Sequence, residues 1–543
     1  MRVYAQNGVI TLADKNTSPS VGKGDDSSRG LAKSGAVFGS MTMASRVLGV
    51  VRDMVVARYF GADAAADAFF IAFKIPNFMR RLFGEGAFSQ AFVPVLSEYR
   101  QTRSLAEVKA LIDRVAGVLG GILAMVTLLA TLGAPLVATI FAPGYVVDAE
   151  KQKLVTDMVR ITFPYLMFIS LTGFAGGILN AYGKFAVPAF TPVLLNIFLI
   201  SGAVLSGYFP VPIYALAWAV FVAGAMQMVF QMPFLKRMNL LPRPRWDTQH
   251  EGVRRILALI VPALFGVSVS QINLLLDTVL ASFLPTGSVS WLYYSDRLWE
   301  LPLGVFGVAL ATVILPSLSR KHADLSREAF SATMDWAMRV VFLIAIPAAT
   351  ALVVLAEPIL ISLYHYGAMT ERDIAMSALS LRAYSMALLA FMLIKVLAPG
   401  YYSRQDTKTP VSIGIKAMAA NMVLNLAFVI PLHVYFKIGH VGLALATMLS
   451  SYMNAYMLYR GLRLGGVYSP LAGWLKYVGK IFLATFVMAV FLLWLSPDIA
   501  EWFGAAWQQR AVILLPLCVG GMVVYGLSLM LMGVKFRHFV TKH

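Results

Sequence analysis

Residues 53–60 read DMVVARYF and residues 277–284 read DTVLASFL, so the same order of aspartate, alanine, aromatic and apolar residues occurs twice in the chain. Further matches keep a separation of 222 to 224 residues. A near-constant offset over a long stretch indicates an internal duplication. The other matched pairs are Pro94 and Pro316, Asp113 and Asp335, Pro135 and Pro358, Gly144 and Gly367, Arg160 and Arg382, and Pro188 and Pro410.

The composition places this duplication in a membrane. Of the 543 residues, 59% are hydrophobic and 13% are charged, whereas soluble domains carry about 25% charged residues. Hydrophobic stretches of about 20 residues cross a bilayer as helices, because backbone groups in lipid must be paired within the segment. The pattern predicts fourteen spans: 34-58, 64-97, 112-141, 156-180, 185-208, 211-235, 256-284, 288-318, 333-362, 376-402, 410-432, 440-462, 474-495 and 511-533.

Lysine and arginine are distributed unevenly between alternate loops. The loop around Arg243 and Arg245 is strongly basic, as is the segment that holds Arg320 and Lys321. Positive loops stay in the cytoplasm, so both termini are predicted to be cytoplasmic. The net charge of +18 therefore reflects topology, and no nucleic-acid partner is expected. The single cysteine, Cys518, excludes an intrachain disulfide framework.

Because six spans separate the two copies, both copies enter the membrane from the same side. We therefore predict an all-α polytopic membrane protein with two pseudo-symmetric six-helix lobes in a parallel repeat, followed by two extra C-terminal helices. Such lobes enclose the substrate site between them. The predicted segments are a disordered tail (1-32), an N-lobe (33-237), a basic cytoplasmic loop (238-255), a C-lobe (256-464) and the last two helices with the C-terminus (465-543).

Three arginines stand inside or close to the first span, at Arg46, Arg52 and Arg58. Ionisable residues at mid-membrane are costly and usually face a cavity or a partner. Arg58 lies near the outer boundary of the span, so we expect it to be an interfacial residue and not part of a binding site. For Arg46 and Arg52 the pattern favours an anion-binding cavity, with Asp53 as a candidate partner of Arg46. Arginine suits phosphate because its planar fork stays charged when desolvated.

The second span adds Asp67 and Arg80, and the eighth adds Arg297, so the cations come from both lobes. Pro76 and the glycines of GEG (84–86) are expected to break the second helix within the membrane. Discontinuous helices with polar residues are places where transporters build their sites.

Four segments resemble a known family. They are SMTMASRVLGVVRD (40–53), FKIPNFMRRLFGEGAFSQAFVPVLSEY (73–99), SVSWLYYSDRLWELPLGVFGVAL (288–310) and APGYYSRQDTKTPV (398–411). Together they are similar to the signatures of the MurJ (MviN) family of lipid II flippases, in the multidrug/oligosaccharidyl-lipid/polysaccharide exporter superfamily. Similarity runs from about Leu31 to the C-terminus, while the N-terminal tail departs from the family pattern.

The resemblance implies a function. Family members move undecaprenyl-pyrophosphate-linked disaccharide-pentapeptide, called lipid II, from the inner to the outer leaflet of the bacterial cytoplasmic membrane for peptidoglycan synthesis. It also implies that Arg46, Arg52, Asp67, Arg80 and Arg297 line a cationic central cavity. Membrane lipids and the cell-wall synthesis machinery are the other partners it implies. The last two helices match a groove thought to hold the lipid tail.

A second set of polar residues suggests ion coupling. Asp277 in the seventh helix, Asn421 and Asn425 in the eleventh and Thr447 in the twelfth offer only hard oxygen ligands of low charge, which suit a monovalent cation such as sodium. Some family members resemble this in holding a sodium ion in the C-terminal lobe. The alternative is that Asp277, the repeat mate of Asp53, and the asparagines only pack helices together. No other cofactor is expected, and membrane potential is the other candidate driving force.

Other function classes fit less well. A polysaccharide-unit or multidrug exporter of the same superfamily is the nearest alternative, although an exporter of organic cations should centre on acidic residues. An intramembrane enzyme is not expected. The sequence has no HExxH motif, most histidines lie in loops, and neither catalytic residues nor a transition-metal site are predicted.

Overall fold

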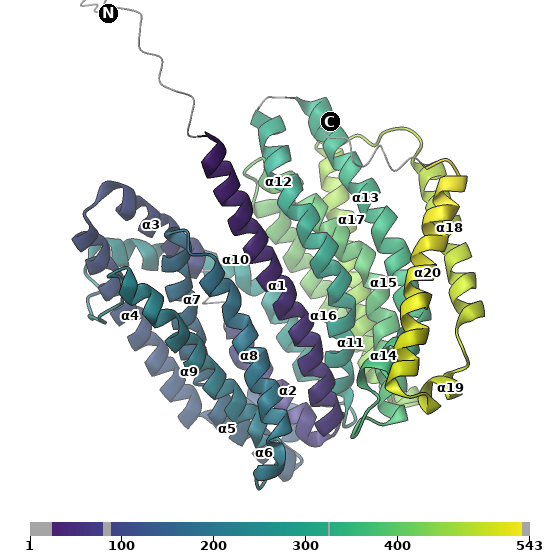
Figure 1. Cartoon of the computed structure of the whole chain (residues 1–543), viewed down its shortest axis with the longest axis horizontal. Coiled ribbons are helices and arrows are strands. Elements are labelled where there is room, and N and C mark those ends of the chain that lie inside the picture. The colour runs from purple at the N-terminus through teal and green to yellow at the C-terminus, as the bar shows by residue number, and fades with distance from the viewer. Residues whose placement is uncertain (1–23, 80–87, 324–325, 535–543) are drawn as a thin grey trace, which may run out of the picture.

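The computed structural model describes residues 24–79, 88–323 and 326–534, and every regular element in these ranges is a helix (Figure 1). The elements are α1 (Gly24–Phe60), α2 (Ala64–Met79), α3 (Phe88–Thr102), α4 (Leu105–Leu132), α5 (Ala134–Phe141), η2 (Pro143–Tyr145), α6 (Ala149–Thr162), α7 (Tyr165–Ala181), α8 (Ala186–Val204), η3 (Ser206–Tyr208), α9 (Tyr214–Arg237), α10 (Glu251–Ala281), α11 (Ser288–Pro302), η4 (Leu303–Gly307), α12 (Val308–Ala323), α13 (Arg327–Val354), α14 (Ala356–Tyr364), α15 (Glu371–Tyr402), α16 (Lys408–Phe436), α17 (Gly439–Leu464), α18 (Trp474–Leu495), α19 (Ile499–Gly504) and α20 (Trp507–Leu531).

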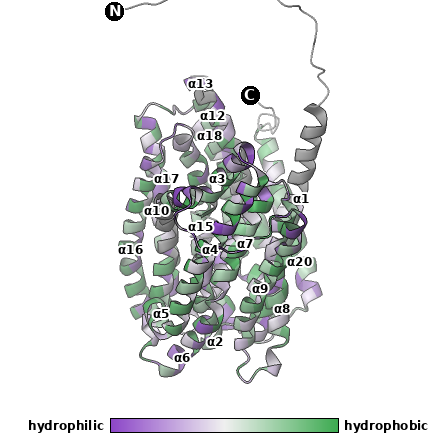
Figure 2. Cartoon of the chain, turned by 90° about the vertical axis from the view of Figure 1, so that its left-hand side faces the viewer, coloured by the Kyte–Doolittle hydropathy of each residue, from purple (hydrophilic) through white to green (hydrophobic). Residues whose placement is uncertain are grey.

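Ten helical segments among the described residues are long and apolar enough to cross a membrane. They correspond to ten of the predicted spans. The other four predicted spans, 34-58, 64-97, 256-284 and 288-318, fall on α1, on α2 with α3, on α10, and on α11 with η4 and α12. The all-helical membrane fold is thus confirmed, while the count of fourteen stays a prediction. Figure 2 shows hydrophobic residues along the helices and hydrophilic ones gathered toward their ends.

The second helix of each lobe is interrupted or carries an internal proline. Pro76 lies inside α2, which continues to Met79, and the GEG glycines lie outside the described residues. In the C-lobe, α11 ends at Pro302 and a π-helical turn, η4, follows before α12. Proline removes a helical hydrogen bond, and π turns are frequent at functional sites. The C-lobe therefore has a discontinuity that the sequence analysis did not predict, whereas α2 continues through Pro76 and the break expected at GEG stays a prediction.

Figure 1 shows the two lobes side by side, with α3, α4, α7 and α9 on one flank and α18 and α20 on the other. The start of α10 packs on the N-lobe, where Val253 and Ile256 join the same apolar cluster as Phe92 and Leu111. The end of α10 packs against α16 and α17 of the C-lobe. This helix therefore connects the two lobes through side-chain packing as well as through the backbone.

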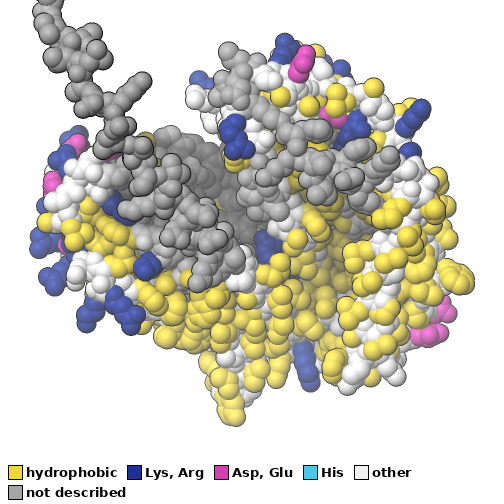
Figure 3. All heavy atoms as spheres, turned by 45° about the horizontal axis from the view of Figure 1, so that its top comes forward, with side chains coloured by type: hydrophobic (Ala, Val, Ile, Leu, Met, Phe, Trp, Pro, Cys, Tyr) yellow, Lys and Arg dark blue, Asp and Glu magenta, His cyan; other side chains and the backbone are white. Residues whose placement is uncertain are grey.

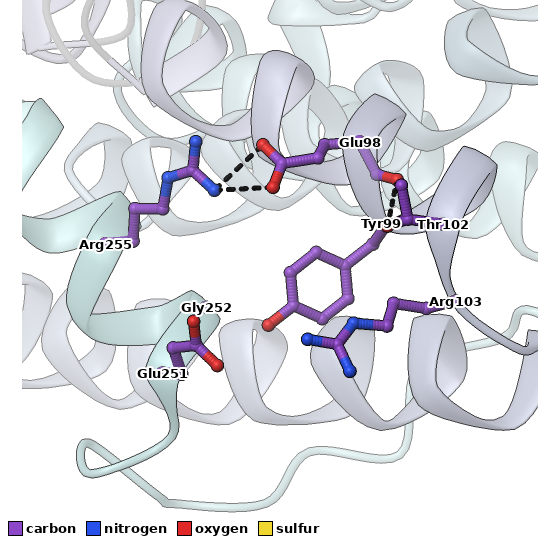
Figure 4. Close-up of a pocket in the computed structure, with 7 residues that line it drawn as sticks. All are labelled: Glu98, Tyr99, Thr102, Arg103, Glu251, Gly252 and Arg255. Carbon is purple, nitrogen blue, oxygen red and sulfur yellow. Dashed lines mark hydrogen bonds and ion pairs between the residues drawn. The ribbon is translucent and has the colours of Figure 1, made fainter. Parts of the chain in front are cut away.

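A polar pocket marks the joint between α10 and the N-lobe (Figure 4). Arg255 pairs with Glu98 across it, with Nη1 2.8 Å from Oε2. The hydrogen bond from Arg255 holds the pKa of Glu98 below its ordinary value. Tyr99 lies beneath this ion pair and close to Gly252, where a Cβ would approach the tyrosine hydroxyl to 2.9 Å. Glycine at the start of α10 therefore lets the helix pack closely on Tyr99.

The lobes meet at the end of the molecule where α1 ends, through residues 58–67, 282–290, Gly144 and Gly367, here called the lobe junction. The Ala368 N–H donates to the Arg58 carbonyl at 2.9 Å, and the Gly144 N–H donates to Ser282 Oγ at 3.0 Å. A Cβ at Gly367 would lie 2.2 Å from the Arg58 oxygen, and one at Gly144 2.3 Å from the Ser282 oxygen. Because Gly144 and Gly367 are repeat mates, these two contacts are equivalent under the pseudo-symmetry.

Another pair of repeat mates, Asp113 and Asp335, closes each lobe. Asp113 accepts a hydrogen bond from the Arg243 N–H at 2.7 Å, and so holds the linker that follows the sixth helix of the N-lobe. Asp335 accepts from the Leu471 N–H at 3.1 Å, in the linker that follows the sixth helix of the C-lobe. The duplication read from the sequence therefore preserves a contact between the third helix and the terminal linker of each lobe.

Asp335→Ala is expected to destabilise the fold strongly. The carboxylate is fully buried and also accepts from Tyr468 Oη at 2.7 Å, Trp474 Nε1 at 2.6 Å and Arg339 Nε at 2.7 Å. Removing one member of such a buried charged network costs about 3 to 5 kcal/mol. Thermal unfolding of the purified protein in detergent should show a lower midpoint. Glu328→Ala, an exposed change in the first turn of the same helix, is the control and should leave the midpoint unchanged.

Candidate functional site

Arg52 lies in a buried network near the end of α1, with 7% of its surface exposed. Its Nη2 donates to Asp53 Oδ1 at 2.7 Å and its Nη1 to Asn196 Oδ1 at 2.9 Å. Tyr293 of α11 closes the network, because its hydroxyl donates to Asp53 Oδ1 at 2.9 Å and accepts from Arg52 Nη2 at 3.1 Å. Arg52 is therefore held between the lobes with its donors largely occupied.

Arg297 approaches the same aspartate from the C-lobe. Its Nε lies 3.8 Å from Asp53 Oδ2, and its Nη1 lies 3.8 Å from Glu300 Oε2. These separations exceed hydrogen-bond length, and 30% of the side chain is exposed. The guanidinium also lies over the Tyr293 ring at 5.0 Å. Arg297 is thus fixed beside Tyr293 and Asp53, while part of its guanidinium stays exposed to a ligand.

Arg46 reaches the C-lobe where η4 provides a glycine. A Cβ at Gly304 would lie 2.0 Å from Arg46 Nη1, so the glycine lets this guanidinium lie directly against the backbone of η4. Within the described part of the chain, Arg46 makes no hydrogen bond and no ion pair. The expectation that Asp53 pairs with Arg46 is therefore wrong. Asp53 pairs with Arg52 and Arg297, because the arginine next to it in sequence folds its side chain back onto the carboxylate.

Asp67 lies in the lobe junction rather than beside the arginines. It is 1% exposed, and its carboxylate accepts from the Gly287 N–H at 2.7 Å, the Ser290 N–H at 2.8 Å and Ser290 Oγ at 2.6 Å. These groups form the N-terminus of α11, where unpaired N–H groups favour a negative charge. Asp67 of the N-lobe therefore caps a helix of the C-lobe.

The structure also brings in two residues that the sequence analysis missed, Asn196 and Tyr293. Tyr293 stands within the SVSWLYYSDRLWELP motif, three residues before Asp296, so its helical position was readable, but its partner was not. Asn196 is a lone amide in the apolar run TPVLLNIFLI, and this was the available signal. Arg80, the remaining predicted cavity residue, lies outside the described residues.

The four predicted ion ligands gather between α10, α16 and α17. Asn425 Nδ2 donates to Asp277 Oδ1 at 2.9 Å and to Asn421 Oδ1 at 3.1 Å, and Thr447 lies next to the Asp277 carboxylate. Asn425 Oδ1 is buried and has no hydrogen-bond partner among the described residues, and the Thr447 hydroxyl faces the Asp277 carboxylate. Buried polar atoms normally have partners, so an unpaired amide oxygen close to a carboxylate and a hydroxyl fits a small hard cation.

Comparison with known proteins shows which families and structures this chain resembles. The family described as "Lipid II flippase MurJ" matches residues 56–508. A "Probable lipid II flippase MurJ" of Vibrio cholerae is 50% identical, over 94% of this chain and 98% of that protein. The "Lipid II flippase MurJ" of Burkholderia cenocepacia is 42% identical, over 92% and 96%. A solved "Lipid II flippase MurJ, inward closed conformation" superposes with a TM-score of 0.75 at 28% identity, covering 93% of this chain and all of that one.

The two lobes, with charged side chains from both at their contact, define a membrane transporter of the multidrug/oligosaccharidyl-lipid/polysaccharide exporter fold. An inward-facing multidrug transporter of that superfamily shares this fold, with a TM-score of 0.65 at 15% identity. Within this class, the length and identity of the sequence matches identify the family. The chain belongs to the MurJ family of lipid II flippases.

Proposed function

We propose that the chain moves lipid II from the inner to the outer leaflet of the bacterial cytoplasmic membrane by alternating access between its lobes. The observation that carries this proposal is the meeting of Arg52 of the N-lobe and Arg297 of the C-lobe at one carboxylate, Asp53. A pyrophosphate bound by Arg46 and Arg297 would replace the hydration shell that the headgroup loses. No covalent step is required, so the proposed activity is transport without catalysis.

The lobe junction supports an inward-facing assignment for this arrangement. The hydrogen bonds that join the lobes at Arg58, Asp67 and Gly144 lie at the end of the molecule where α1 terminates. Lys and Arg side chains lie at the top of the right half and along the left edge of the left half, and the lower central part of this face is mostly hydrophobic (Figure 3). If the basic end is cytoplasmic, as the positive-inside rule requires, the junction closes the outer side. The substrate would then enter from the inner leaflet.

The function is tested by depleting the protein in cells. Depletion should make lipid II accumulate in the inner leaflet and stop peptidoglycan synthesis, and re-expression should reverse both effects. A polysaccharide-unit exporter or a drug exporter would leave lipid II translocation intact. Co-purification with peptidoglycan synthases would test the implied association with the cell-wall machinery.

Orientation is tested at the loop that holds Arg243. A cysteine at that position, in a Cys518→Ser background, should resist an impermeant maleimide in intact spheroplasts and react after lysis. Cysteine at exposed Tyr208, at the opposite end of the N-lobe, is the matched control and should react in both states. Reaction at position 243 in intact spheroplasts would invert the topology.

Ion coupling at Asp277 is the further proposal for this activity. Asp277, Asn421, Asn425 and Thr447 would hold a monovalent cation such as sodium, which would neutralise the carboxylate and favour one arrangement of the lobes. Membrane potential would supply the rest of the drive, since moving each negative charge outward is favoured by about 2.3 kcal/mol per 100 mV.

Asp277→Asn is expected to remove sodium dependence from flipping. In proteoliposomes at fixed potential and ionic strength, the wild-type rate should rise with sodium, while the variant rate should not respond. The asparagine removes the only full negative charge of the set but keeps its size. A wild-type rate that ignores sodium would leave membrane potential or passive exchange as the driver and would refute the ion site.

A further inference from the structure

An apolar cavity opens on the flank of the N-lobe that faces away from the C-lobe. It measures about 440 Å³ and lies between α4, α7 and α9, beneath the linker that follows α9. Figure 1 shows these three helices on the outer side of the N-lobe. Gly120, Phe174, Met228 and Leu235 are among its lining residues. The volume falls in the range of about 300 to 1,000 Å³ that is typical of ligand pockets.

Glycines of α4 shape this cavity in two different ways. A Cβ at Gly117 would lie 2.2 Å from the Arg245 oxygen, and one at Gly121 would lie 2.3 Å from the Trp246 ring, so these glycines let the linker rest on the helix. Gly120, in contrast, has nothing within 4 Å of the position of a Cβ. A side chain at position 120 would therefore project into the cavity without striking the backbone.

The mouth of the cavity is basic. Pro242 and Pro244 line it, and the exposed residues Arg243 and Arg245 alternate with them in the linker. The nearby acids are already engaged. Asp113 accepts from Lys109 and from the Arg243 N–H. Asp247 pairs with Arg114 at 2.8 Å, and this hydrogen bond keeps the pKa of Asp247 below its ordinary value.

The Arg243 and Arg245 guanidiniums therefore have no carboxylate partner among the residues that the structure describes. Trp246 follows them in the linker with 66% of its surface exposed. Tryptophan and arginine at the edge of an apolar surface are typical of the membrane interface. The mouth thus combines positive charge with an interfacial anchor.

We propose that this cavity binds one acyl chain of an anionic phospholipid of the inner leaflet, whose phosphate is held by Arg243 and Arg245. The apolar lining matches a hydrocarbon chain, and the two guanidiniums match a headgroup of net negative charge. The cavity opens on the flank of the N-lobe, away from the Arg52 and Arg297 pairing. Its occupant is therefore a bulk membrane lipid and not the transported molecule.

Native mass spectrometry of the full chain in detergent tests the proposal, with dioleoyl phosphatidylglycerol and dioleoyl phosphatidylethanolamine as probes. Wild type should retain one phosphatidylglycerol in preference to phosphatidylethanolamine. The double change Arg243→Gln/Arg245→Gln should weaken that retention about thirtyfold, since each basic residue contributes about 1 kcal/mol. Gly120→Leu should weaken the retention of both lipids, because the leucine side chain fills the space for the acyl chain.

Two matched variants control for general effects. Arg460→Gln removes an exposed cation at the basic end of α17, and Gly479→Leu adds a side chain at an exposed glycine of α18 with nothing within 4 Å. Both should retain phosphatidylglycerol as wild type does.

Equal retention of the two lipids by wild type, or full retention by the double arginine variant, would overturn the proposal. So would displacement of phosphatidylglycerol from this site by undecaprenyl pyrophosphate, which would make it a substrate-tail site. The arginine variant alters only exposed side chains, so its result stands even if Gly120→Leu fails to fold.

Discussion

Arg297→Ala and Arg46→Ala should each abolish lipid II flipping while the protein still inserts into the membrane at normal levels. Both guanidiniums are open to a ligand: Arg297 lies 3.8 Å from its two carboxylates and is partly exposed, and Arg46 has no ion pair among the described residues. Hydrogen bonds to charged groups contribute about 1.5 to 3 kcal/mol each, so loss of a bidentate fork should slow flipping by about a hundredfold or more. Complementation of a flippase-depleted strain, with blotting of the membrane fraction, measures both quantities.

Lysine should rescue these positions poorly, because an ammonium offers no planar fork for a pyrophosphate. Arg460→Ala removes an exposed cation remote from the site and is the control, with normal growth expected. Wild-type growth of a strain that carries alanine at both 46 and 297 would refute the anion-cavity mechanism.

Arg52→Ala should behave differently, although all three arginines looked alike in the sequence. Asp53 is 2% exposed, and Arg52 is its closest partner. Loss of that partner leaves a buried carboxylate, a change that costs about 3 to 5 kcal/mol, so the amount of folded protein should fall together with flipping. The distinction between a ligand-binding cation and a structural one becomes visible only once the partners are known.

Asp67→Ala should open the lobe junction. The variant leaves the Gly287 and Ser290 N–H groups without the carboxylate that now accepts from them. A loss of about 3 kcal/mol would shift the balance between closed and open junction by about a hundredfold. A cysteine at Ala62, which is 8% exposed, should then react faster with an impermeant maleimide added outside spheroplasts, in a Cys518→Ser background.

Asp67→Asn should give an intermediate rate, since one oxygen remains to accept a hydrogen bond. Glu150→Ala, which removes an exposed acid of α6, should leave labelling unchanged. If Asp67 served only as a substrate contact, flipping would fall in the alanine variant while the labelling rate at position 62 stayed at the wild-type value.

The sequence predicted the helical membrane fold and the parallel duplication because both depend on patterns along the chain. Hydrophobic length identifies spans, and a constant offset identifies repeat mates such as Asp113 and Asp335. It also selected Asp277, Asn421 and Asn425, which the structure brings together through hydrogen bonds. Here helical spacing placed the asparagines on one face, and the shortage of other polar residues left few alternatives.

The pairing of charges was not readable in the same way. Asp53 was assigned to Arg46 from helical spacing, but side-chain conformation decided in favour of Arg52. Asp67 looked like a cavity residue, whereas its contacts with Gly287 and Ser290 lie 220 and 223 positions away. Contacts between the lobes join residues that are far apart in the sequence, and no local pattern encodes such pairs.

The equivalent contacts that Asp113 and Asp335 make with the linkers of their lobes bear on the origin of the molecule. Each aspartate binds the linker that leaves its own six-helix lobe. Each lobe therefore holds its own C-terminal linker before the next helices begin. The duplication therefore copied a unit that already carried the contact holding its own C-terminal connection. The helix pair α18 and α20 then represents an accretion onto a completed ending. In the C-lobe, Asp335 also accepts from Trp474 of α18, so the added helices have become part of the network that holds this ending.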